Sequence, residues 1–439
     1  MSTSGSITPP PKLRLSLLGA WRAQRKGWLD QFVRLQAEHG DLVELQLGRR
    51  RVFLLSDPAL IHEVLALAKP VMKERGLQVN ARLFLGDGLL TSQGETYKRQ
   101  RQLGRPAVQA EHFPAQAAVI QDCFERTQAP WRDGESRDLA RECADVTLRA
   151  AAESVLGVNF DRQLAATHAW LEEISEFARR AISNPLYFVY QHLPLPRPIR
   201  FRRARAGLNR MLEEALSASR GRPTWLGHLE AAGGELTPAQ IRDLAKSVLL
   251  AGYETTANAL AWTLYLISGN PGVERQLLQE FAAAPPSAAT DPLPALPYTL
   301  QVVRESMRLY PPVWIVGREA LTDIDLGRLQ LRRGDTVYMS QYIVHRDPRH
   351  FPNPTRFDPE RFASGNNHAG TTPAYFPFGA GPRSCIGKQF ALQELALGLR
   401  HWLPRWRFVI DRPEPIGLDA VVTLKPLGRL RMKVFRRTA

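Results

Sequence analysis

The residues best suited to carry chemistry are Cys385 and the glycine-rich segment that leads to it. The segment runs Phe378-Gly379-Ala380-Gly381-Pro382-Arg383-Ser384-Cys385-Ile386-Gly387. Glycines let the backbone approach a large planar group and adopt positive φ. A helix predicted to start at Cys385 would stabilise a thiolate through its unsatisfied N–H groups and its dipole. Arg383 adds a cation that suits a carboxylate. The pattern favours one metal held by one sulfur over a buried structural thiol, which is the interpretation for Cys123 and Cys143.

This loop matches the pattern Phe-x-x-Gly-x-Arg-x-Cys-x-Gly of the cytochrome P450 superfamily, which the chain resembles over nearly its whole length. The resemblance implies an α+β, mostly α-helical fold, with a long central helix over haem and small β-sheets in the N- and C-terminal parts. It implies that Cys385 is the axial iron ligand of haem b, because thiolate ligation is that family's established chemistry. Phe378 and Gly379 would contact the cofactor, and Arg383 would bind a haem propionate.

A second family pattern, Glu-x-x-Arg, falls on the helix predicted over residues 298–310. Glu305 and Arg308 are three residues apart and therefore share one helix face. Downstream, the segment 357–362 matches the family's Pro-Glu-Arg-Phe pattern and contributes Arg361. The resemblance implies that the three side chains form a buried structural triad. The alternative is a solvated surface pair, which would be worth little.

The long helix predicted over residues 237–270 carries the third match, Ala251-Gly252-Tyr253-Glu254-Thr255-Thr256. Glycine in a helix interior costs about 1 kcal/mol relative to alanine, so a specific role is expected for Gly252. A threonine that bonds back to the i−4 carbonyl loosens the helix locally. By resemblance this region is a notch for dioxygen and water, and Glu254 and Thr255 deliver the two protons that cleaving O–O requires. The alternative is a threonine that only caps or packs.

Three more residues resemble the family's propionate-binding side chains. Tyr97 and Arg101 lie four residues apart in the segment 94–101, where tyrosine stands in the place that tryptophan commonly takes. A phenol can donate a hydrogen bond as an indole does. Arg318 follows Pro311-Pro312-Val313-Trp314 and matches another propionate-binding arginine. Taken singly, each arginine would be expected to be exposed.

The elements that position these residues follow from periodicity and from helix and turn signals. Helical spacing dominates residues 92–283, with breaks at 114, 130–134 and 184–198. The expected elements are helices 27–39, 56–66, 237–270, 271–284, 298–310 and 385–403, strands 41–47, 51–55, 407–410, 420–424 and 429–435, several short strands in 313–343, and loops at 70–91 and 346–382. A helical middle with strands at both ends predicts an α+β class. We expect one domain over residues 1–439, including an N-terminal extension at 1–25.

Composition indicates the class of protein and the cellular compartment. The chain has 439 residues, of which 44% are hydrophobic and 23% charged, so a substantial core is expected and wholesale disorder is excluded. Three cysteines cannot build a disulfide framework, which favours a reducing compartment. We find neither a run of about 18 apolar residues that could span a membrane nor a secretory signal, and we expect a cytoplasmic monomer that touches a membrane peripherally at most.

The net charge of +15 points to acidic partners, a membrane surface or nucleic acid. Nucleic acid is disfavoured because the arginines are dispersed and no recognised binding motif accompanies them. No Rossmann glycine motif follows a strand, so we expect NAD(P)H electrons to arrive through a ferredoxin or flavodoxin and its reductase. The exposed cations expected to bind that acidic partner are Lys388, Arg400 and Arg405. A peroxide-driven enzyme and a haem-thiolate sensor are the alternatives, and the pair Glu254 and Thr255 speaks against both.

The segments 84–91, 308–315 and 374–379 look like those of soluble bacterial P450s that hydroxylate carotenoids. We therefore expect a lipophilic substrate, a carotenoid first, with a fatty acid or another terpenoid as the alternative. The residues expected to line the pocket are Ala251, Trp314, Ile315 and Val316. Beside the arginine cluster of residues 200–205, the apolar run Tyr187, Phe188, Val189 and Tyr190 suggests an entrance that dips into the bilayer. The alternative is that these aromatics close the fold and the arginines are solvated.

Overall fold

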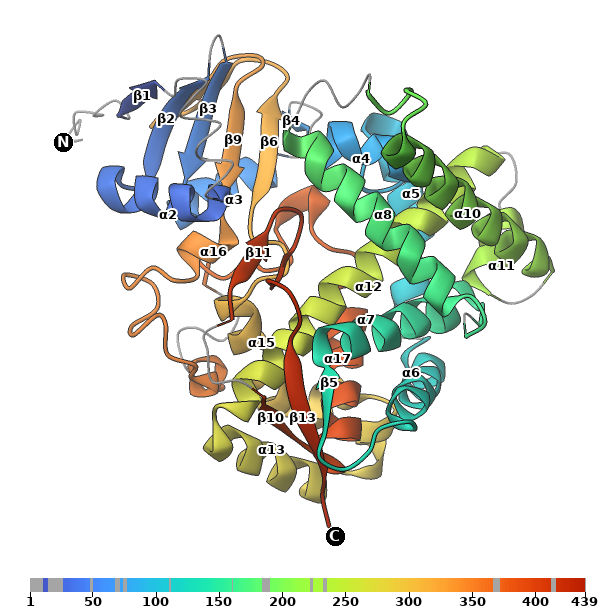
Figure 1. Cartoon of the computed structure of the whole chain (residues 1–439). Helices are drawn as coiled ribbons and strands as arrows, with labels where there is room; N and C mark the ends of the chain where they lie inside the picture. Colours follow the sequence, from blue (N-terminus) through green and yellow to red (C-terminus); the bar gives the residue numbers. More distant parts are fainter. Residues whose placement is uncertain are drawn as a thin grey trace. The chain divides into compact units, whose positions relative to one another are not determined.

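The computed structural model divides the chain into two compact units (Figure 1), which are considered separately. The sheet unit comprises residues 1–77, 313–356 and 370–385, and the helical unit comprises residues 78–312, 357–369 and 386–439. The residues that the structure describes are 11–14, 27–47, 50–67, 72–73, 77–109, 112–159, 161–183, 190–221, 224–231, 235–365, 372–411 and 416–438.

The sheet unit is built on a six-stranded sheet with the order β1-β2-β3-β9-β6-β4. Its elements are β1 (Lys12–Arg14), α2 (Trp28–His39), β2 (Leu42–Leu47), β3 (Arg50–Leu55), α3 (Pro58–Ala66), β4 (Met72–Lys73), β6 (Val316–Ala320), β7 (Ile324–Leu326), β8 (Leu329–Leu331), β9 (Thr336–Met339), α16 (Gln341–Val344) and the short helix η6 (Gly381–Arg383). β2 and β3 form the predicted antiparallel hairpin, and β9 adds parallel to β3 although it comes about 280 residues later in the chain. The central strands thus bring together segments that are far apart in the sequence.

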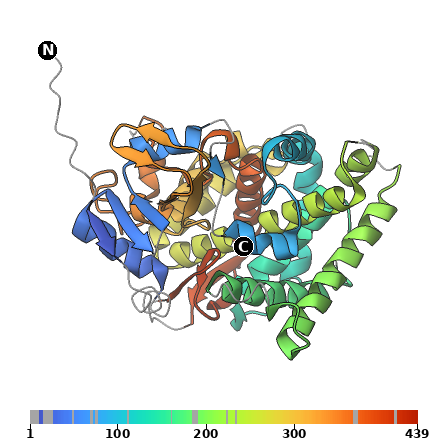
Figure 2. The ribbon, with the colours of Figure 1, turned by 90° about the horizontal axis from the view of Figure 1, so that it is seen from above.

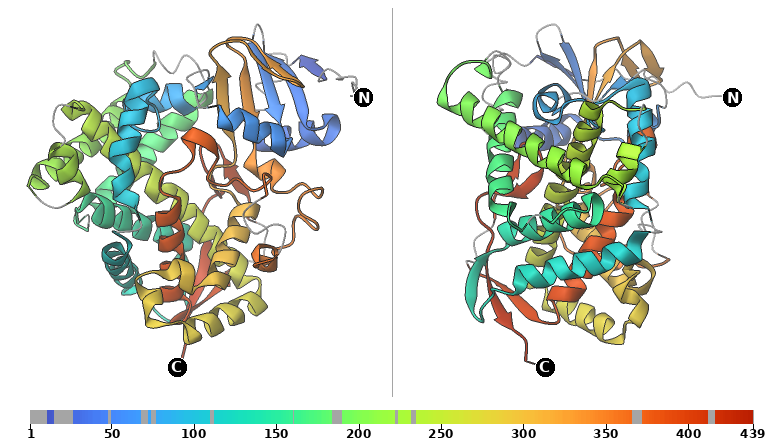
Figure 3. Two further views of the ribbon diagram at one scale, coloured as in Figure 1. Left: turned by 180° about the vertical axis from the view of Figure 1, so that it is seen from behind. Right: turned by 90° about the vertical axis from the view of Figure 1, so that its right-hand side faces the viewer.

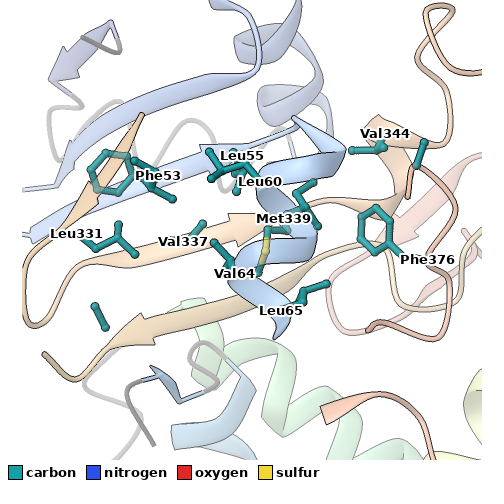
Figure 4. Close-up of a cluster of buried hydrophobic side chains, with 14 of the residues drawn as sticks. Phe53, Leu55, Leu60, Val64, Leu65, Leu331, Val337, Met339, Val344 and Phe376 are labelled. Atoms are coloured by element: carbon teal, nitrogen blue, oxygen red, sulfur yellow. The ribbon is translucent and has the colours of Figure 1, made fainter. Parts of the chain in front are cut away.

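A buried apolar cluster holds α3 against this sheet (Figure 4). Strand residues such as Phe53 and Met339 face Leu60 and Val64 of the helix, and Phe376 closes one end of the cluster. The helix starts where the sequence predicts, since the Asp57 carboxylate accepts hydrogen bonds from the first backbone N–H groups. Through Phe376, the segment that leads to Cys385 is therefore part of this buried core.

The helical unit contains most of the helices. They are α4 (Leu77–Leu85), α5 (Gly94–Gly104), η1 (Arg105–Val108), α6 (Phe113–Gln128), α7 (Leu139–Ala150), the π-helical turn η3 (Ala151–Leu156), α8 (Leu164–Ser183), α10 (Pro196–Ala218), α11 (Trp225–Ala231), α12 (Pro238–Ser268), α13 (Pro271–Ala283), η4 (Pro286–Ala289), α14 (Pro292–Ala295), α15 (Pro297–Leu309), η5 (Pro359–Phe362) and α17 (Lys388–Trp402). No helix among the described residues is long and apolar enough to cross a bilayer.

The 31-residue helix α12 is the axis of this unit. Thr237 and Gln240 form a reciprocal capping box at its start, and Pro238 occupies its first turn. Figures 2 and 3 show it as a long yellow-green helix that crosses the unit, in contact with α7, α15 and α17. Nineteen of its residues are buried, which explains how a helix of this length is stabilised by packing on several sides.

The C-terminal strands complete the helical unit. β10 (Trp406–Ile410) and β13 (Arg431–Arg436) are antiparallel, and β5 (Glu135–Asp138) adds to the other edge of β13. A separate hairpin, β11 (Leu418–Ala420) and β12 (Leu424–Pro426), lies beside α12. Helices and small separate sheets confirm the predicted α+β class.

Several sequence predictions differ from the structure. Residues 70–91 were expected to form a loop, but α4 occupies 77–85, because Gly86, with φ of 67°, ends a helix there rather than excluding one. The polar strand β5 lies in a region expected to be helical or broken, and its pairing with β13 decides its conformation. Residues 420–424, expected to be one strand, are the turn and flanking residues of the β11–β12 hairpin.

Candidate functional site

The loop that ends at Cys385 belongs to the sheet unit and has the predicted backbone. Gly379 and Gly381 have φ of 66° and 68°, in the left-handed region that glycine tolerates. The Cys385 N–H donates to the Phe378 carbonyl over 3.0 Å, which closes the loop on itself. Helix α17 begins at Lys388, so Cys385 precedes the helix by three residues instead of starting it, as the sequence had suggested. The backbone is the reason, since Ser384 is extended with ψ of 151° and Gly387 is the residue that caps α17.

Two contacts fix this loop to the sheet-unit core. A Cβ on Gly381 would lie 2.0 Å from the backbone oxygen of Leu65 on α3, so only glycine permits this approach. The Phe376 N–H donates to Nε2 of His345 over 3.1 Å, and both residues are buried. His345 was missed by the sequence reasoning, because its partner lies 31 residues away and no local pattern marks the pair.

The three cysteines differ in exposure, and a cysteine that holds a metal through its sulfur must be accessible. Cys123 and Cys143 are buried, whereas Cys385 is exposed. Burial raises the pKa of Cys123 to about 12 and raises that of Cys143 well above the ordinary value. Neither buried thiol therefore forms a thiolate at neutral pH. An exposed sulfur on a glycine loop, with Arg383 two residues before it, fits a haem iron.

Glu305, Arg308 and Arg361 meet within the helical unit. The Arg308 Nε and Nη2 atoms donate to the two Glu305 carboxylate oxygens over 2.7 and 2.9 Å. Arg361 Nε lies 3.4 Å from Glu305 Oε1, and the Asp358 N–H donates to the same oxygen over 2.9 Å. The Glu305 and Arg308 side chains are both 0% exposed, which excludes the surface-pair alternative.

The centre of α12 presents the predicted acid and alcohol. Thr255 Oγ1 donates to the Ala251 carbonyl over 2.6 Å, the i−4 bond expected from the sequence. A Cβ on Gly252 would meet only Ala151 at 3.6 Å, an ordinary contact, so packing does not demand glycine there. The Glu254 carboxylate accepts a 2.8 Å hydrogen bond from Thr423. Thr423 lies 169 residues away and was missed by the sequence reasoning.

The remaining predicted cofactor residues lie on elements of both units. On α5, Arg101 Nη1 lies 3.2 Å from the hydroxyl of Tyr97, a pair that the helical spacing of four residues brings together. In the sheet unit, Arg318 on β6 is buried and donates to the Gly317 carbonyl, so it is not the exposed arginine expected by default. Trp314 is also buried.

The proposed membrane entrance is only partly described. Tyr187, Phe188 and Val189 lie outside the described residues, and Tyr190 is half-buried. Arg202 donates to the Gln191 carbonyl over 2.6 Å and Arg205 donates to the Leu83 carbonyl over 2.8 Å. These two arginines therefore bind backbone and are not simply solvated.

Comparison with known proteins identifies the family. Residues 9–431 match the family model Cytochrome P450. The chain is 34% identical over 400 residues to cyclooctatin synthase of Streptomyces melanosporofaciens, covering 88% of this chain and 86% of that one. It is 28% identical to pentalenene oxygenase of Streptomyces avermitilis, covering 95% of each. The crystal structure of a cytochrome P450DA mutant heme domain superposes with a TM-score of 0.84 at 24% identity, covering 98% of both chains.

The family match spans almost the whole chain, and the similar solved structure has the same fold over nearly its full length. Members of this family bind haem through a cysteine thiolate and react with O2. The chain belongs to the cytochrome P450 family and is a monooxygenase.

Proposed function

We propose that this enzyme hydroxylates a terpenoid. The observation that carries this substrate class is the similarity to cyclooctatin synthase and pentalenene oxygenase, which are terpenoid-oxidising enzymes. The residues predicted to line the pocket are apolar and suit a hydrocarbon skeleton. They are Ala251, Trp314, Ile315 and Val316.

A carotenoid, which is itself a long terpenoid, is the narrower candidate. The segments 84–91, 308–315 and 374–379 favour it through their resemblance to carotenoid-hydroxylating P450s. A compact cyclic terpenoid and a long polyene demand very different pockets, so a ligand series separates them. A fatty acid is the remaining alternative.

Within the proposed site, Cys385 would hold haem iron through its thiolate, and Phe378 and Gly379 would contact the ring. Haem supplies the redox chemistry that activates O2 once electrons reach it. The cations assigned to the propionates are Arg101, Arg318 and Arg383, together with the Tyr97 hydroxyl, because charge-assisted hydrogen bonds to carboxylates are strong.

Glu254 and Thr255 would move protons. Cleaving the O–O bond and releasing water consumes two protons, and a dry pocket needs protein groups to supply them. Glu254, a half-buried carboxylate on α12, would supply the proton, and the Thr255 hydroxyl would accept it and pass on its own. The i−4 bond to Ala251 holds that hydroxyl at a fixed position on the helix.

Electrons would come from a ferredoxin or flavodoxin. Lys388 and Arg405 are exposed at the two ends of the segment that contains α17, and Arg400 is half-buried between them. Cations in this arrangement would accelerate encounter with an acidic partner. The association rate should therefore fall steeply as salt increases.

The test is a ligand panel on the haem-loaded protein. Cyclic terpenes, carotenoids and fatty acids of similar size are added in turn, and the haem absorption band is followed for a low-to-high-spin shift. Ligands that give the shift are then incubated with a surrogate ferredoxin, its reductase and NADPH, and the products are analysed. Hydroxylated terpenes would support the proposal, whereas shifts and products from fatty acids alone would reject it.

A further inference from the structure

A hydrogen-bond chain of three side chains ends on Glu254. Asn258, one turn further along α12, donates through Nδ2 to Thr423 Oγ1 over 3.1 Å. Thr423 Oγ1 donates to Glu254 Oε1 over 2.8 Å. A hydroxyl has one proton to give, and the Asn258 amide fills an acceptor site of that hydroxyl. The threonine proton is therefore directed at the carboxylate.

Burial makes this chain stronger than a surface contact. Asn258 and Thr423 are each 7% exposed, so water competes poorly for their hydrogen bonds. Thr255 is adjacent to Glu254 in sequence, but its hydroxyl donates to the Ala251 carbonyl and not to the Glu254 carboxylate. Thr423 is thus the hydroxyl that donates to the acid.

The hairpin that carries Thr423 is tied down on several sides. The indole N–H of Trp262 donates to the Leu424 carbonyl over 3.1 Å, and the Leu424 N–H donates to the Pro312 carbonyl over 2.9 Å. At the other strand, Arg179 of α8 donates through both terminal nitrogens to the Asp419 carboxylate. These contacts place the Thr423 backbone independently of its bond to Glu254.

We propose that Thr423, oriented by Asn258, is a positioning residue that holds the Glu254 carboxylate where it can deliver protons. The inference rests on the proposed role of Glu254. A side chain with several rotatable bonds on a helix surface samples other rotamers unless a partner selects one. A displacement of about 1 Å in a reacting group can cost as much as 100-fold in rate. The hydrogen bond from Thr423 selects one rotamer of the Glu254 side chain.

The test compares Thr423→Val with Thr423→Ser, which keeps the hydroxyl. Thr263→Val is the matched control, since Thr263 is a buried threonine on α12 that donates to the Ala259 carbonyl. With O2, NADPH and a surrogate redox partner, we expect T423V to lower kcat about 10- to 100-fold with KM changed less than about 2-fold, because a positioning residue acts on proton delivery and not on substrate binding. T423S should recover most of kcat, and T263V should resemble the wild type.

Two further measurements separate positioning from a structural effect. Hydrogen peroxide brings its own protons and both oxygen atoms, so peroxide-driven product formation should be nearly equal in T423V and the wild type. Without any turnover, the shifts in urea midpoint caused by T423V and E254Q should be non-additive, because the two residues share one bond. Asn258→Leu should lower kcat in the same direction and replaces T423V if that variant is unstable.

The outcomes distinguish this inference from the function on which it rests. If E254Q lowers kcat but T423V and N258L do not, the positioning role is wrong and Glu254 keeps its role. If E254Q itself has wild-type kcat, the acid assignment fails and the inference fails with it. Equal losses in the O2-driven and peroxide-driven reactions would also overturn the inference, as would T423S behaving like T423V.

Discussion

Replacing Glu305 by glutamine is the sharpest test of the buried triad. The amide keeps the shape of the carboxylate but removes its charge, so the Arg308 guanidinium, at 0% exposure, would lose the carboxylate that lies 2.7 Å from its Nε atom. Removing one partner of a buried ion pair typically costs about 3–5 kcal/mol. Because whole proteins are stable by only about 5–15 kcal/mol, E305Q should lose a large part of the folding free energy.

The chain offers a control with the same sequence spacing. Glu95 and Lys98 are also three residues apart on a helix and form an ion pair, but their side chains are 87% and 68% exposed. Water screens that pair, so E95Q should change the free energy of unfolding by at most about 1 kcal/mol. Identical substitutions at identical spacing thus isolate the effect of burial.

The assay is urea unfolding followed by circular dichroism on both variants and the wild type, all prepared with haem. We expect a clear fall in the midpoint for E305Q and a negligible one for E95Q. If E305Q does not fold well enough to purify, its yield of haem-containing protein relative to E95Q gives the same ranking. Equal midpoints for the two variants would refute the assignment of Glu305 to a buried structural role.

Three further predictions concern the thiols, the loop and a buried amine. In haem-free protein at pH 8, iodoacetamide should label Cys385 and spare Cys123, whose pKa is raised to about 12 by burial, and peptide mass spectrometry would show it. Gly381→Ala should abolish the carbon-monoxide spectrum of the haem protein, because the added Cβ would lie 2.0 Å from a backbone oxygen. Gly379→Ala has open space around it, so it should lower the free energy of unfolding by only about 1–2 kcal/mol through its left-handed backbone. Burial lowers the pKa of Lys246, so the unfolded chain binds that proton more tightly than the folded protein does. The free energy of unfolding should therefore rise with pH between the lowered pKa and the ordinary 10.5. Urea midpoints would measure this rise, which should vanish in Lys246→Met.

Local signals predicted much of the fold well. The β2–β3 hairpin, the capped start of α12 and the end of α15 before Pro311 all depend on residues close together in sequence. The errors occur where distant partners decide the conformation. The segment Glu-Ser-Arg-Asp of β5 has no strand propensity, and it becomes a strand because β13, about 300 residues later, offers an open edge.

In the site, too, contacts between residues close in sequence were predictable and contacts between distant segments were not. The bond from Thr255 to Ala251 was predictable because it spans four residues of one helix. The bond from Thr423 to Glu254 was not, because nothing in a short window marks one threonine in a C-terminal hairpin as the partner of an acid 169 residues earlier. The motifs identify the groups that we propose to react, whereas the side chains that contact those groups depend on how distant elements pack. His345 and Thr423 are therefore worth testing by mutagenesis beside the motif residues, since His345 accepts a hydrogen bond from the loop that leads to Cys385 and Thr423 donates one to Glu254.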